Sequence, residues 1–364
     1  MKPIRIAQVM GKWVGGGVEA VVMNYYRNID KKKIQFDFIF DDDSNDIPYD
    51  EIEKLGGKVI LIPPYQKVFK YHKELKRVLM SGNYKIVHSH INTLSVFSLF
   101  AAKKAGVPVR IAHSHSTTNK KEWKKNLLKL VLRPLSKKYA THYFACTEHA
   151  AKWMFGDNED TYILNNAIDL NKFKYSKQIR EEKRKELKIK EDTFVIGHIG
   201  RFVKQKNHEF IIDVFNEIHK ENKNAVLLLV GKGPLMDEIK EKVKELKLTK
   251  NVKFLGQRSD VNELYQAFDL FLFPSLYEGL GMVAIEAQTS GLQCIASAEV
   301  PNIAKVTDCL EFLELEDSIE TWKNVILEKT NSKRKNHVSE VKEAGYDIKT
   351  EVKKLEEKYI ELSK

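Results

Sequence analysis

Short runs of β-branched and other apolar residues alternate with helical periodicities from one end of the chain to the other. Strands that recur with helices between them are typical of a parallel sheet with helices on both faces. In the first half of the chain, the expected strands are IRIAQVM (4–10), QFDFIF (35–40), KVILI (58–62), KIVHSH (85–90), RIAHSH (110–115) and THYFACT (141–147). A second series comprises FVIGHIG (194–200), AVLLLVG (225–231), NVKFLG (251–256), DLFLFPS (269–275) and CIAS (294–297). The alternation therefore predicts an α/β chain with two parallel sheets in tandem.

The length of 364 residues exceeds what a single hydrophobic core normally supports, so the two sheets are expected to form two Rossmann-like domains. The join is expected within 170–192, which is polar, dense in charge and poor in strand signals. We therefore place the domains at 1–172 and 173–345. The last segment, 346–364, is expected to form one amphipathic helix that packs back on the first domain, with an apolar stripe of Ile348, Val352, Leu355 and Tyr359.

The net charge of +11 favours a polyanionic substrate, an anionic membrane surface or nucleic acid as a partner. The three cysteines, Cys146, Cys294 and Cys309, are scattered without metal-type spacing, which indicates reduced thiols in a cytosolic protein. No apolar run has the length and flanks of a signal peptide or of a membrane span. We therefore expect a cytoplasmic protein.

Three glycines, Gly15, Gly16 and Gly17, follow the first expected strand and precede a helix. Glycines in this position let backbone N–H groups approach a ligand closely, and the helix N-terminus favours an anion. A tight turn with positive φ accounts for one glycine but poorly for three in a row. The pattern GKWVGGGVE is not G-x-G-x-x-G and no acidic residue stands at the usual ribose position, so a dinucleotide is weakly supported.

Two cations, Arg201 and Lys206, lie in GRFVKQKN on the loop between a strand's carboxyl end and the next helix. Open α/β sheets bind ligands at such loops. Arginine offers a bidentate fork and lysine a point charge, which together suit a diphosphate. The alternative is a pair of solvated cations on a lysine-rich surface.

The stretch SLYEGLGMVAIEA (275–287) also follows an expected strand and opens a helix. Gly279 and Gly281 would expose backbone N–H groups at the start of this helix. Glu278 lies on the loop, and Glu286 lies about one turn into the helix. Acidic residues near a helix N-terminus can simply offset the helix dipole, at about 0.3–1 kcal/mol each, but this role does not require the flanking glycines.

EGLGMVAIEA, together with GRFVKQKN upstream, closely resembles the E-x7-E signature of the retaining glycosyltransferases of family 4, which have the GT-B fold. The three-glycine loop, LNNAIDLNKF (164–173) and VGKGPL (230–235) are similar as well, so the resemblance spans most of the chain. The family usually shows Asn-Gly where this chain has Asn166-Ala167; the departure concerns turn geometry, since Asn also tolerates the αL conformation. The resemblance implies an active site in the cleft between an N-terminal acceptor-binding domain and a C-terminal domain that binds a nucleotide-sugar.

The resemblance also implies roles for individual residues. Arg201 and Lys206 would neutralise the diphosphate of the nucleotide-sugar, and Glu286 would accept hydrogen bonds from its ribose. His115, in HSHSTT, and Glu278 are then the candidate catalytic residues beside the donor sugar. The other donor-binding candidates are Gly16 and Gly17 at the diphosphate, the backbone of Gln257 and Arg258 at the base, and Gly279, Leu280, Gly281, Met282 and Val283 at the sugar and its phosphate. No metal ion or further cofactor is expected, because cations and helix N-termini would handle the charge of the leaving diphosphate.

Four histidines, His88, His90, His113 and His115, end two expected strands, and residues i and i+2 of a strand lie on one face. Such a group can be a metal cluster, but no cysteine joins it and no carboxylate is near in sequence, so we do not expect a metal. For His88 and His113 the plain interpretation is a half-buried histidine with satisfied hydrogen bonds.

Two charged segments, 41–43 and 119–140, can each be interpreted either as a binding segment or as an ordinary solvated or packed part of the structure. The run 41–43, Asp-Asp-Asp, is similar to the metal-binding Asp-x-Asp of the other main glycosyltransferase fold, but that fold has one nucleotide-binding domain, so a solvated acidic loop is expected. The segment 119–140 combines apolar residues at helical spacing with seven lysines, which suits an anionic membrane surface at the inner face of the cell membrane. The alternative is a helix that packs on its own sheet with solvated lysines. Its aromatic residues are not interleaved with the basic ones, which disfavours nucleic acid.

The resemblance implies a retaining, metal-independent hexosyltransferase that uses a nucleoside-diphosphate sugar, in the first place a UDP-sugar. The predicted acceptor is lipid-linked or an oligosaccharide, and similarity to polysaccharide-cluster members of the family indicates capsular polysaccharide or exopolysaccharide biosynthesis. A nucleotide-sugar 2-epimerase of the same fold is the alternative, with Glu278 and the histidines as acid/base groups. A basic nucleic-acid-binding protein is a weaker alternative.

Overall fold

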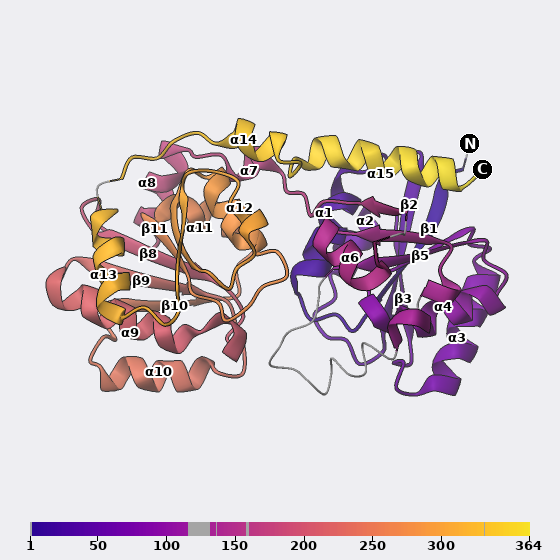
Figure 1. Ribbon diagram of the computed structural model, residues 1–364, viewed down its shortest axis with the longest axis horizontal. Helices are drawn as coiled ribbons and strands as arrows, with labels where there is room; N and C mark the ends of the chain where they lie inside the picture. Colours follow the sequence, from indigo (N-terminus) through magenta and orange to yellow (C-terminus); the bar gives the residue numbers. More distant parts are fainter. Residues whose placement is uncertain (1, 116–131, 136, 158–159, 331) are drawn as a thin grey trace. The chain divides into compact units, whose positions relative to one another are not determined.

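The computed structural model describes residues 2–115, 132–135, 137–157, 160–330 and 332–364. The chain divides into two compact units: Met1–Ile168 with Gly345–Lys364, and Asp169–Ala344. In each unit helices cover both faces of a parallel sheet (Figure 1), as the alternation of strands and helices predicts.

The described strands of the first unit form one sheet in the order β3-β2-β1-β4-β5-β6-β7. They are β1 (Ile4–Gly11), β2 (Ile34–Asp41), β3 (Lys58–Ile62), β4 (Ile86–Ser89), β5 (Val109–Ser114), β6 (His142–Ala145) and β7 (Thr161–Ile163). The strand order changes direction between β1 and β4, where Ile6 is the partner of Ile86. At such a switch point the carboxyl ends of the strands leave a crevice that can bind a ligand.

The two faces of this sheet are covered by different helices. The described helices are α1 (Gly17–Asn28), α2 (Tyr49–Lys54), α3 (Val68–Ser81), α4 (Ser95–Lys104), α6 (Glu148–Phe155) and α15 (Ile348–Leu362), with a 3-10 turn η1 (Asn92–Leu94). The core under α1 and α15 takes alternate residues such as Ile6 and Phe36, whereas α3, α4 and α6 cover the opposite residues such as Ala7 and Val9. This alternation is what a strand with both faces buried requires.

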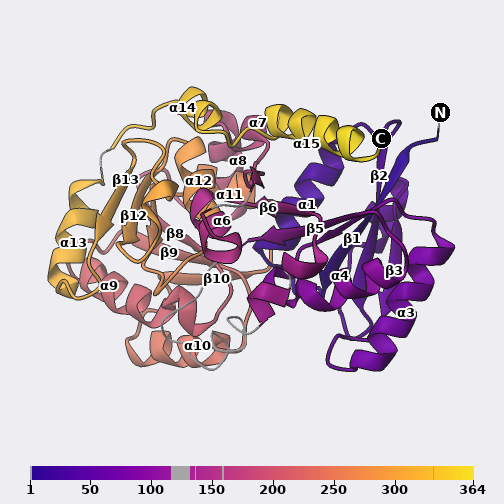
Figure 2. The ribbon, with the colours of Figure 1, turned by 45° about the vertical axis from the view of Figure 1, so that its right-hand side comes forward.

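The C-terminal helix α15 lies beside α1 (Figure 2), as the apolar stripe predicts. All four stripe residues are buried in the core of the first unit: Ile348, Val352, Leu355 and Tyr359. The returning chain is held by Ile168, whose N–H donates to the carbonyl of Tyr346 and whose carbonyl accepts from the N–H of Ile348. Asp347 then caps the helix by accepting a hydrogen bond from the N–H of Lys349.

The described strands of the second unit form a sheet in the order β10-β9-β8-β11-β12-β13. They are β8 (Phe194–Ile199), β9 (Ala225–Val230), β10 (Val252–Gly256), β11 (Leu270–Phe273), β12 (Gln293–Ser297) and β13 (Leu310–Leu313). Here the order changes direction between β8 and β11, where Ile196 is the partner of Leu270. The second candidate crevice therefore lies at the carboxyl ends of β8 and β11.

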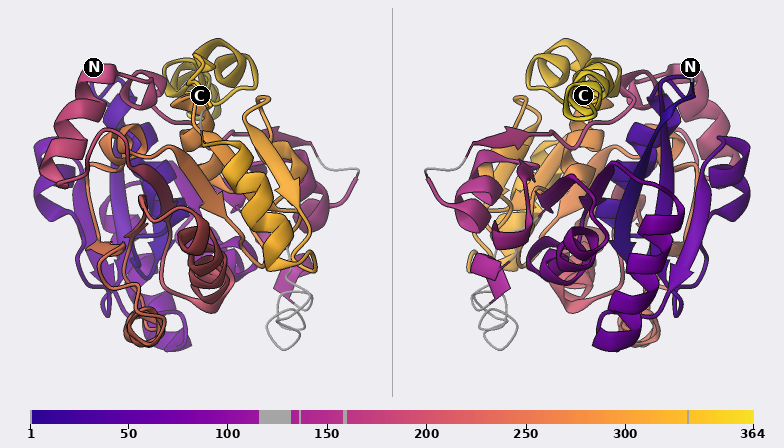
Figure 3. Two further views of the ribbon diagram at one scale, coloured as in Figure 1. Left: turned by 90° about the vertical axis from the view of Figure 1, so that its left-hand side faces the viewer. Right: turned by 90° about the vertical axis from the view of Figure 1, so that its right-hand side faces the viewer.

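Helices cover both faces of the second sheet as well (Figure 3). They are α7 (Leu170–Phe173), α8 (Lys177–Glu186), α9 (His208–Glu221), α10 (Met236–Glu245), α11 (Val261–Ala267), α12 (Met282–Thr289), α13 (Ile319–Glu328) and α14 (Val338–Glu343), with 3-10 turns η2 (Lys204–Lys206) and η3 (Asn302–Ala304). One core lies under α9, α10 and α13, and the other under α11 and α12. Phe202 and Phe273 belong to opposite cores, so both faces of the sheet are closed near its carboxyl edge.

The segment 170–192, in which the join was expected, contains α7 and α8, and the division between the two units falls between Ile168 and Asp169. Helix α8 packs through its charges: Arg184 donates to Asp269 and to the carbonyl of Thr193, and Arg180 donates to the carbonyl of Phe268. Ion pairs and carbonyl contacts therefore dock a segment that has few apolar residues. The sequence analysis did not predict strands β7 and β13, because each is short and only partly buried.

The remaining expectations concern thiols and membranes. All three cysteines are buried free thiols, as expected. Among the described helices, none combines the length and apolarity that a bilayer crossing would need. Most of the basic segment 119–140 lies outside the described residues; its described part is helical at 132–135 and 137–139, where Lys137 donates to the carbonyl of Phe155.

Candidate functional site

Two loops at the switch point of the second sheet are tied together by hydrogen bonds. One follows β8 and the other follows β11. The N–H of Leu276 donates to the carbonyl of Gln205 at 2.8 Å, and the side chain of Gln205 donates to the carbonyl of Tyr277 at 2.9 Å. Asn207, which has the left-handed φ of 55°, donates from its side chain to the carbonyl of Pro274 at 3.1 Å. The predicted cation loop, which follows β8, and the E-x7-E loop, which follows β11, are therefore joined side by side.

The predicted charges meet on this surface. Lys206 Nζ lies 2.6 Å from Oε1 of Glu278, and the two side chains are only 16 and 8% exposed. The same ammonium lies 5.0 Å from the ring centroid of Phe273. Arg201 is exposed, and the described residues offer it no ion-pair partner. The site thus holds one neutralised cation and one that is available to an anion.

Helix α12 begins at Met282, within the stretch 275–287 that was predicted to open a helix, and Gly281 is its N-cap with φ of 85°. No side chain caps this helix, so the backbone N–H groups of its first turn are not satisfied by a cap side chain. Gly279 is exposed beside this helix start, Leu280 is buried, and Val283 lies in the first turn. The predicted contacts 279–283 therefore surround an open helix N-terminus of the kind that binds anions.

Glu286 lies one turn further into α12, as predicted. Its Oε2 accepts a hydrogen bond from the hydroxyl of Tyr265 at 2.9 Å. Burial raises the pKa of Glu286 to about 7, even though the hydrogen bond from Tyr265 acts in the opposite direction. A carboxylate with one proton donor and remaining lone pairs can accept hydrogen bonds from ligand hydroxyl groups.

The predicted base-contact residues follow β10. The guanidinium of Arg258 donates to both carboxylate oxygens of Asp260, at 2.7 and 2.6 Å, and to Glu186 at 2.8 Å. Two guanidinium nitrogens of Arg258, Nε and Nη2, are therefore engaged, while Gln257 is exposed. These ion pairs hold the side chain against Asp260 and Glu186, which favours the backbone as the group that meets a ligand.

The glycine loop of the first unit contains one residue that requires glycine for its conformation. Gly15 has φ of 63°, Gly16 is the extended N-cap of α1, and Gly17 is the first helical residue. Sequence reasoning missed Glu19, which is 7% exposed and accepts a hydrogen bond from the N–H of Val14 at 3.1 Å. The turn thus explains Gly15, and a role for Gly16 and Gly17 in ligand binding stays a prediction.

A pocket of about 390 Å³ lies at the carboxyl ends of β1 to β4 in the first unit. It is lined by Lys12, Glu19, Asp41, Asp43 and His90, among others. Lys12 and Asp43 form an ion pair at 2.7 Å. The expectation that 41–43 is a solvated loop is wrong for Asp41, which is buried at the end of β2. Burial and the neighbouring acidic residues raise its pKa to about 6.

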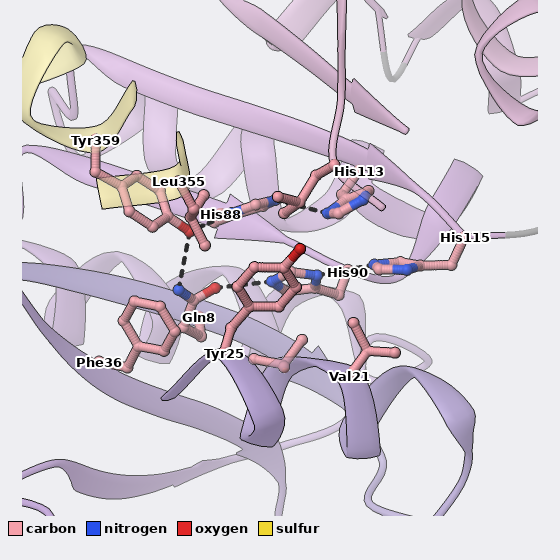
Figure 4. A pocket seen from close by; sticks show the side chains of 12 residues that line it. Gln8, Val21, Tyr25, Phe36, His88, His90, His113, His115, Leu355 and Tyr359 are labelled. Carbon is pink, nitrogen blue, oxygen red and sulfur yellow. Dashed lines mark hydrogen bonds between the residues drawn. The ribbon is translucent and has the colours of Figure 1, made fainter. Parts of the chain in front are cut away.

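The four histidines at the ends of β4 and β5 lie together, because these strands are neighbours in the sheet. The expectation that His88 and His113 are half-buried is wrong: they are 0 and 1% exposed. His88 Nε2 lies 2.9 Å from His113 Nδ1, and His90 Nδ1 lies 2.9 Å from His115 Nε2 (Figure 4). The ring nitrogens of His88, His90 and His113 also lie within 4.8 Å of one another, which is compatible with a metal. A metal would have to displace the hydrogen bonds that already join the rings.

Two further polar residues of this group were missed by the sequence analysis. Gln8 Oε1 lies 2.7 Å from His90 Nε2, and the hydroxyl of Tyr359 lies 2.6 Å from His88 Nδ1. Gln8 stands in a strand pattern and Tyr359 in an apolar stripe, so neither carries a local signal of polar function. The structure assigns His115 to this network in the first unit; Lys206, Glu278 and Glu286 lie in the second.

Comparisons with known proteins agree with the motifs. Residues 179–344 match the family described as glycosyl transferases group 1, and residues 15–172 match glycosyltransferase family 4. A Bacillus subtilis (strain 168) protein named EpsF, assigned as a glycosyltransferase, is 35% identical over 364 residues, which cover 96% of this chain and 94% of that protein. The UDP-Gal:α-D-GlcNAc-diphosphoundecaprenol α-1,3-galactosyltransferase of Escherichia coli is 28% identical over 326 residues, which cover 85% of this chain and 83% of that enzyme.

A solved structure shows the same fold. Anabaena Alr3699/HepE, in complex with UDP-glucose, superposes with a TM-score of 0.82 at 19% identity, covering 98% of this chain and 100% of that chain. The resemblance carried by the E-x7-E stretch and its upstream cations is thereby confirmed at the level of family and fold. This chain belongs to the group 1 glycosyltransferases, with the two Rossmann-like domains of the GT-B fold and an N-terminal domain of glycosyltransferase family 4.

Proposed function

We propose that this glycosyltransferase moves a hexose from a UDP-sugar to a lipid-linked or oligosaccharide acceptor, with retention of anomeric configuration, in the synthesis of a bacterial cell-surface polysaccharide. The observation that carries the donor half is the contact of Lys206 with Glu278 beside the open N-terminus of α12. A diphosphate bound there would meet an ammonium, the guanidinium of Arg201 and backbone N–H groups.

Departure of UDP develops negative charge on the diphosphate, and these groups stabilise that charge in the transition state. The acceptor hydroxyl attacks the anomeric carbon on the face from which UDP leaves. The C–O bond to the diphosphate breaks, the new glycosidic C–O bond forms, and the hydroxyl proton passes to the leaving phosphate. No separate general base is required, and no metal is required to neutralise the diphosphate.

The remaining donor contacts follow the sequence predictions. Glu286 accepts hydrogen bonds from the ribose hydroxyls, the backbone at Gln257 and Arg258 contacts the base, and Glu278 with 279–283 holds the sugar and its phosphate. Gly16 and Gly17 contribute backbone N–H groups to the diphosphate, and His115 contacts the transferred sugar. The side-chain engagement of Arg258 with Asp260 and Glu186 supports a backbone role for this residue.

Two relatives support the choice of substrates. The Escherichia coli enzyme is named for a UDP-galactose donor and a diphosphoundecaprenol acceptor, and the Anabaena structure contains UDP-glucose. The pocket of the first unit, with a volume of about 390 Å³, is large enough for one or two sugar rings. We assign it to the acceptor, whose hydroxyl groups would bond to Asp41 and to the Lys12–Asp43 pair.

A thermal-shift series with UDP, GDP and dTDP tests the donor assignment, because a ligand that binds the native state raises the melting temperature. UDP should give the largest shift, and EDTA should leave it unchanged. Transfer is then assayed with UDP-glucose and UDP-galactose against an undecaprenyl-diphosphate sugar. An epimerised UDP-sugar without acceptor would favour the 2-epimerase instead. Salt-sensitive binding of oligonucleotides without any response to nucleotides would favour a nucleic-acid-binding protein.

We also propose that the basic segment 119–140 binds the protein to a membrane surface. Its lysines would hold the protein against an anionic bilayer, close to a lipid-linked acceptor. Co-sedimentation with liposomes that contain phosphatidylglycerol should exceed that with neutral liposomes. Replacement of Lys124 and Lys125 by Glu should remove the difference, whereas equal sedimentation with both kinds of liposome would exclude this part.

A further inference from the structure

A row of polar side chains crosses the otherwise apolar core between the first sheet and its helices α1 and α15. Gln8, His88 and His113 stand on the sheet face that also carries Ile6, Ile86 and Ile111. Together with His90, His115 and Tyr359 they line a small cavity, about 10 Å³, with room for about one water molecule at most (Figure 4). Buried polar groups persist in a core only when their hydrogen bonds are satisfied, so the proton positions in this row are constrained.

The first branch of the row starts at Gln8 and ends at His115. Gln8 Oε1 can only accept, so the proton of His90 must be on Nε2, 2.7 Å away. A neutral His90 then has an unprotonated Nδ1, which accepts a hydrogen bond from Nε2–H of His115 at 2.9 Å. A neutral His115 is left with an unprotonated Nδ1. This atom is buried and has no partner among the described residues.

The second branch starts at Tyr359. The side-chain amide of Gln8 donates to the hydroxyl of Tyr359 at 3.2 Å, so that hydroxyl is free to donate to Nδ1 of His88 at 2.6 Å. His88 then carries its proton on Nε2 and donates it to Nδ1 of His113 at 2.9 Å. His113 is left with its proton on Nε2, which also has no partner among the described residues.

Both branches require neutral imidazoles. Burial holds the pKa of His88, His90 and His113 well below the ordinary 6.5. Burial also lowers the pKa of His115 to about 3. One N–H per ring is therefore the rule at neutral pH. Gln8 Oε1 determines which nitrogen carries it in the first branch, and the hydroxyl of Tyr359 determines it in the second.

We propose that Gln8 is a positioning residue that fixes His115 in the Nε2–H tautomer, so that its Nδ1 accepts a hydrogen bond from a hydroxyl group of the bound sugar. Its functional half depends on the proposed function, since that function is what brings a sugar to His115. A hydroxyl brings a proton to this contact, whereas a carboxylate or phosphate oxygen brings none. The contact therefore requires a hydroxyl group at that position of the sugar.

The tautomers can be read directly in the full-length protein. With nitrogen-15 in the histidine rings, two-bond proton–nitrogen correlations distinguish Nε2–H from Nδ1–H. The His115→Gln variant identifies the signals of His115, and His113→Gln those of His113. Wild-type His115 should be Nε2–H and neutral from about pH 6 to 8, and wild-type His113 should also be Nε2–H.

The variants Gln8→Leu and Tyr359→Phe each change one branch, so the other branch serves as the internal control. Gln8→Leu removes the acceptor for His90, so His90 and then His115 should move towards the Nδ1–H form, while His113 keeps its tautomer. Tyr359→Phe removes the donor to His88, so the signals of His113 should change while those of His115 stay. With UDP-sugar and acceptor, Gln8→Leu should lower kcat/KM about 10-fold without weakening UDP, the loss of one hydrogen bond.

Any one of the following results would overturn the proposal: an Nδ1–H tautomer of His115 in the wild type, unchanged His115 tautomers in Gln8→Leu, or a stoichiometric metal whose removal shifts the signals of His88, His90 and His113. The tautomer of His115 in the wild type tests the proposal even if the Gln8→Leu variant does not fold. If the tautomers are as stated but no UDP-sugar binds, the proposed function fails and the tautomer assignment stands. If transfer occurs but Gln8→Leu matches wild type in kcat/KM, the positioning role of Gln8 fails and the proposal with it, although the proposed function stands.

Discussion

Lys206 Nζ lies 2.6 Å from Oε1 of Glu278, although the two residues are 72 positions apart in the chain. The pair is largely buried, and its two loops are joined by further hydrogen bonds through Gln205 and Asn207. Each residue serves as counter-ion to the other, so a diphosphate that binds Lys206 must share the ammonium with Glu278. In the proposed function, the carboxylate would then lie next to the phosphate and the sugar attached to it.

Lys206→Met should weaken UDP far more than uridine. A hydrogen bond between charged groups is worth about 1.5–3 kcal/mol, which corresponds to roughly 10- to 100-fold in Kd. Uridine lacks the phosphates, so its affinity should change little. Isothermal titration with both ligands makes the comparison, and an equal loss for uridine would indicate a general disturbance of the loop rather than a lost phosphate contact.

Glu278→Gln should separate binding from transfer. The amide no longer competes for the ammonium of Lys206, so UDP should bind as tightly as in the wild type or several-fold more tightly. Transfer should slow by about 10-fold or more, because the carboxylate beside the departing group is lost. A variant with weaker UDP and a normal kcat would contradict this assignment of Glu278.

Glu286→Gln should stabilise the protein at alkaline pH while it weakens the donor. The folded-state pKa of Glu286 is raised to about 7, above its ordinary 4.5. The folded state therefore holds this proton more tightly than the unfolded state, and stability falls as the pH rises from about 4.5 to 7. Glutamine carries no such charge, so above pH 7 the variant should gain on the order of 1–3 kcal/mol.

The matched measurement for Glu286 is denaturant unfolding at pH 5 and pH 8, compared with UDP titration at pH 8. Wild type and Glu286→Gln should differ in stability at pH 8 and agree closely at the acidic end. Ribose contacts are lost in the variant, so its UDP affinity should fall while uracil binding does not change. An equal stability difference at both pH values would show that burial of the Glu286 charge is not its cause.

Gly17→Ala tests whether a ligand approaches the glycine loop. A methyl group at Gly17 meets no atom within 4 Å, and the residue is the first of helix α1. The variant should therefore fold with unchanged or slightly raised melting temperature, because alanine is the better helix former. If the diphosphate lies against this backbone, KM for the UDP-sugar should rise about 10-fold. An unchanged KM would leave Gly17 with a role in the turn alone.

Periodicity was sufficient to predict the described strands except β7 and β13, as well as the E-x7-E helix. Strands buried on both faces have continuous apolar runs, as in AVLLLVG, and Gly281 with Met282 marks the helix start. Short, partly buried strands such as β7 lack this signal. The charge-dense α8 lacks it too, since its docking depends on carbonyl groups supplied by residues 193 and 266–268.

Some residues of the candidate site could be predicted from the sequence, and others could not. Arg201, Lys206 and Glu278 carry charges in loops next to strands, which is a local signal, and the structure brings Lys206 and Glu278 together. Gln8 and Tyr359 carry no such signal, because their polar contacts come from strands and a helix more than 80 residues away. Pairing between distant segments is decided by the strand order, which a single sequence does not reveal.

Gly231→Ala should disturb the loop that carries Arg201. Gly231 has φ of 136°, and a methyl group there would lie 2.1 Å from the carbonyl oxygen of Gly200. Since real contacts of this kind do not occur, the strand ends must move apart, and the cost should exceed the ~1–2 kcal/mol of an unfavourable φ alone. Gly256→Ala is the control: its φ is 66° and the nearest side-chain atom is 4.0 Å away.

Both substitutions lie at the carboxyl edge of the second sheet, so the melting temperature of that unit measures the effect of each substitution on stability. Gly231→Ala should lower the melting temperature more than Gly256→Ala and should also weaken UDP, because displacement of Gly200 carries Arg201 with it. Gly256→Ala should lower stability modestly and leave UDP affinity near wild type. The contrary result would be an equal loss of stability in the two variants together with wild-type affinity for UDP. In that case the close approach of Gly231 to Gly200 does not position the loop that carries Arg201. The affinity for UDP would then come from Lys206 and the N-terminus of α12.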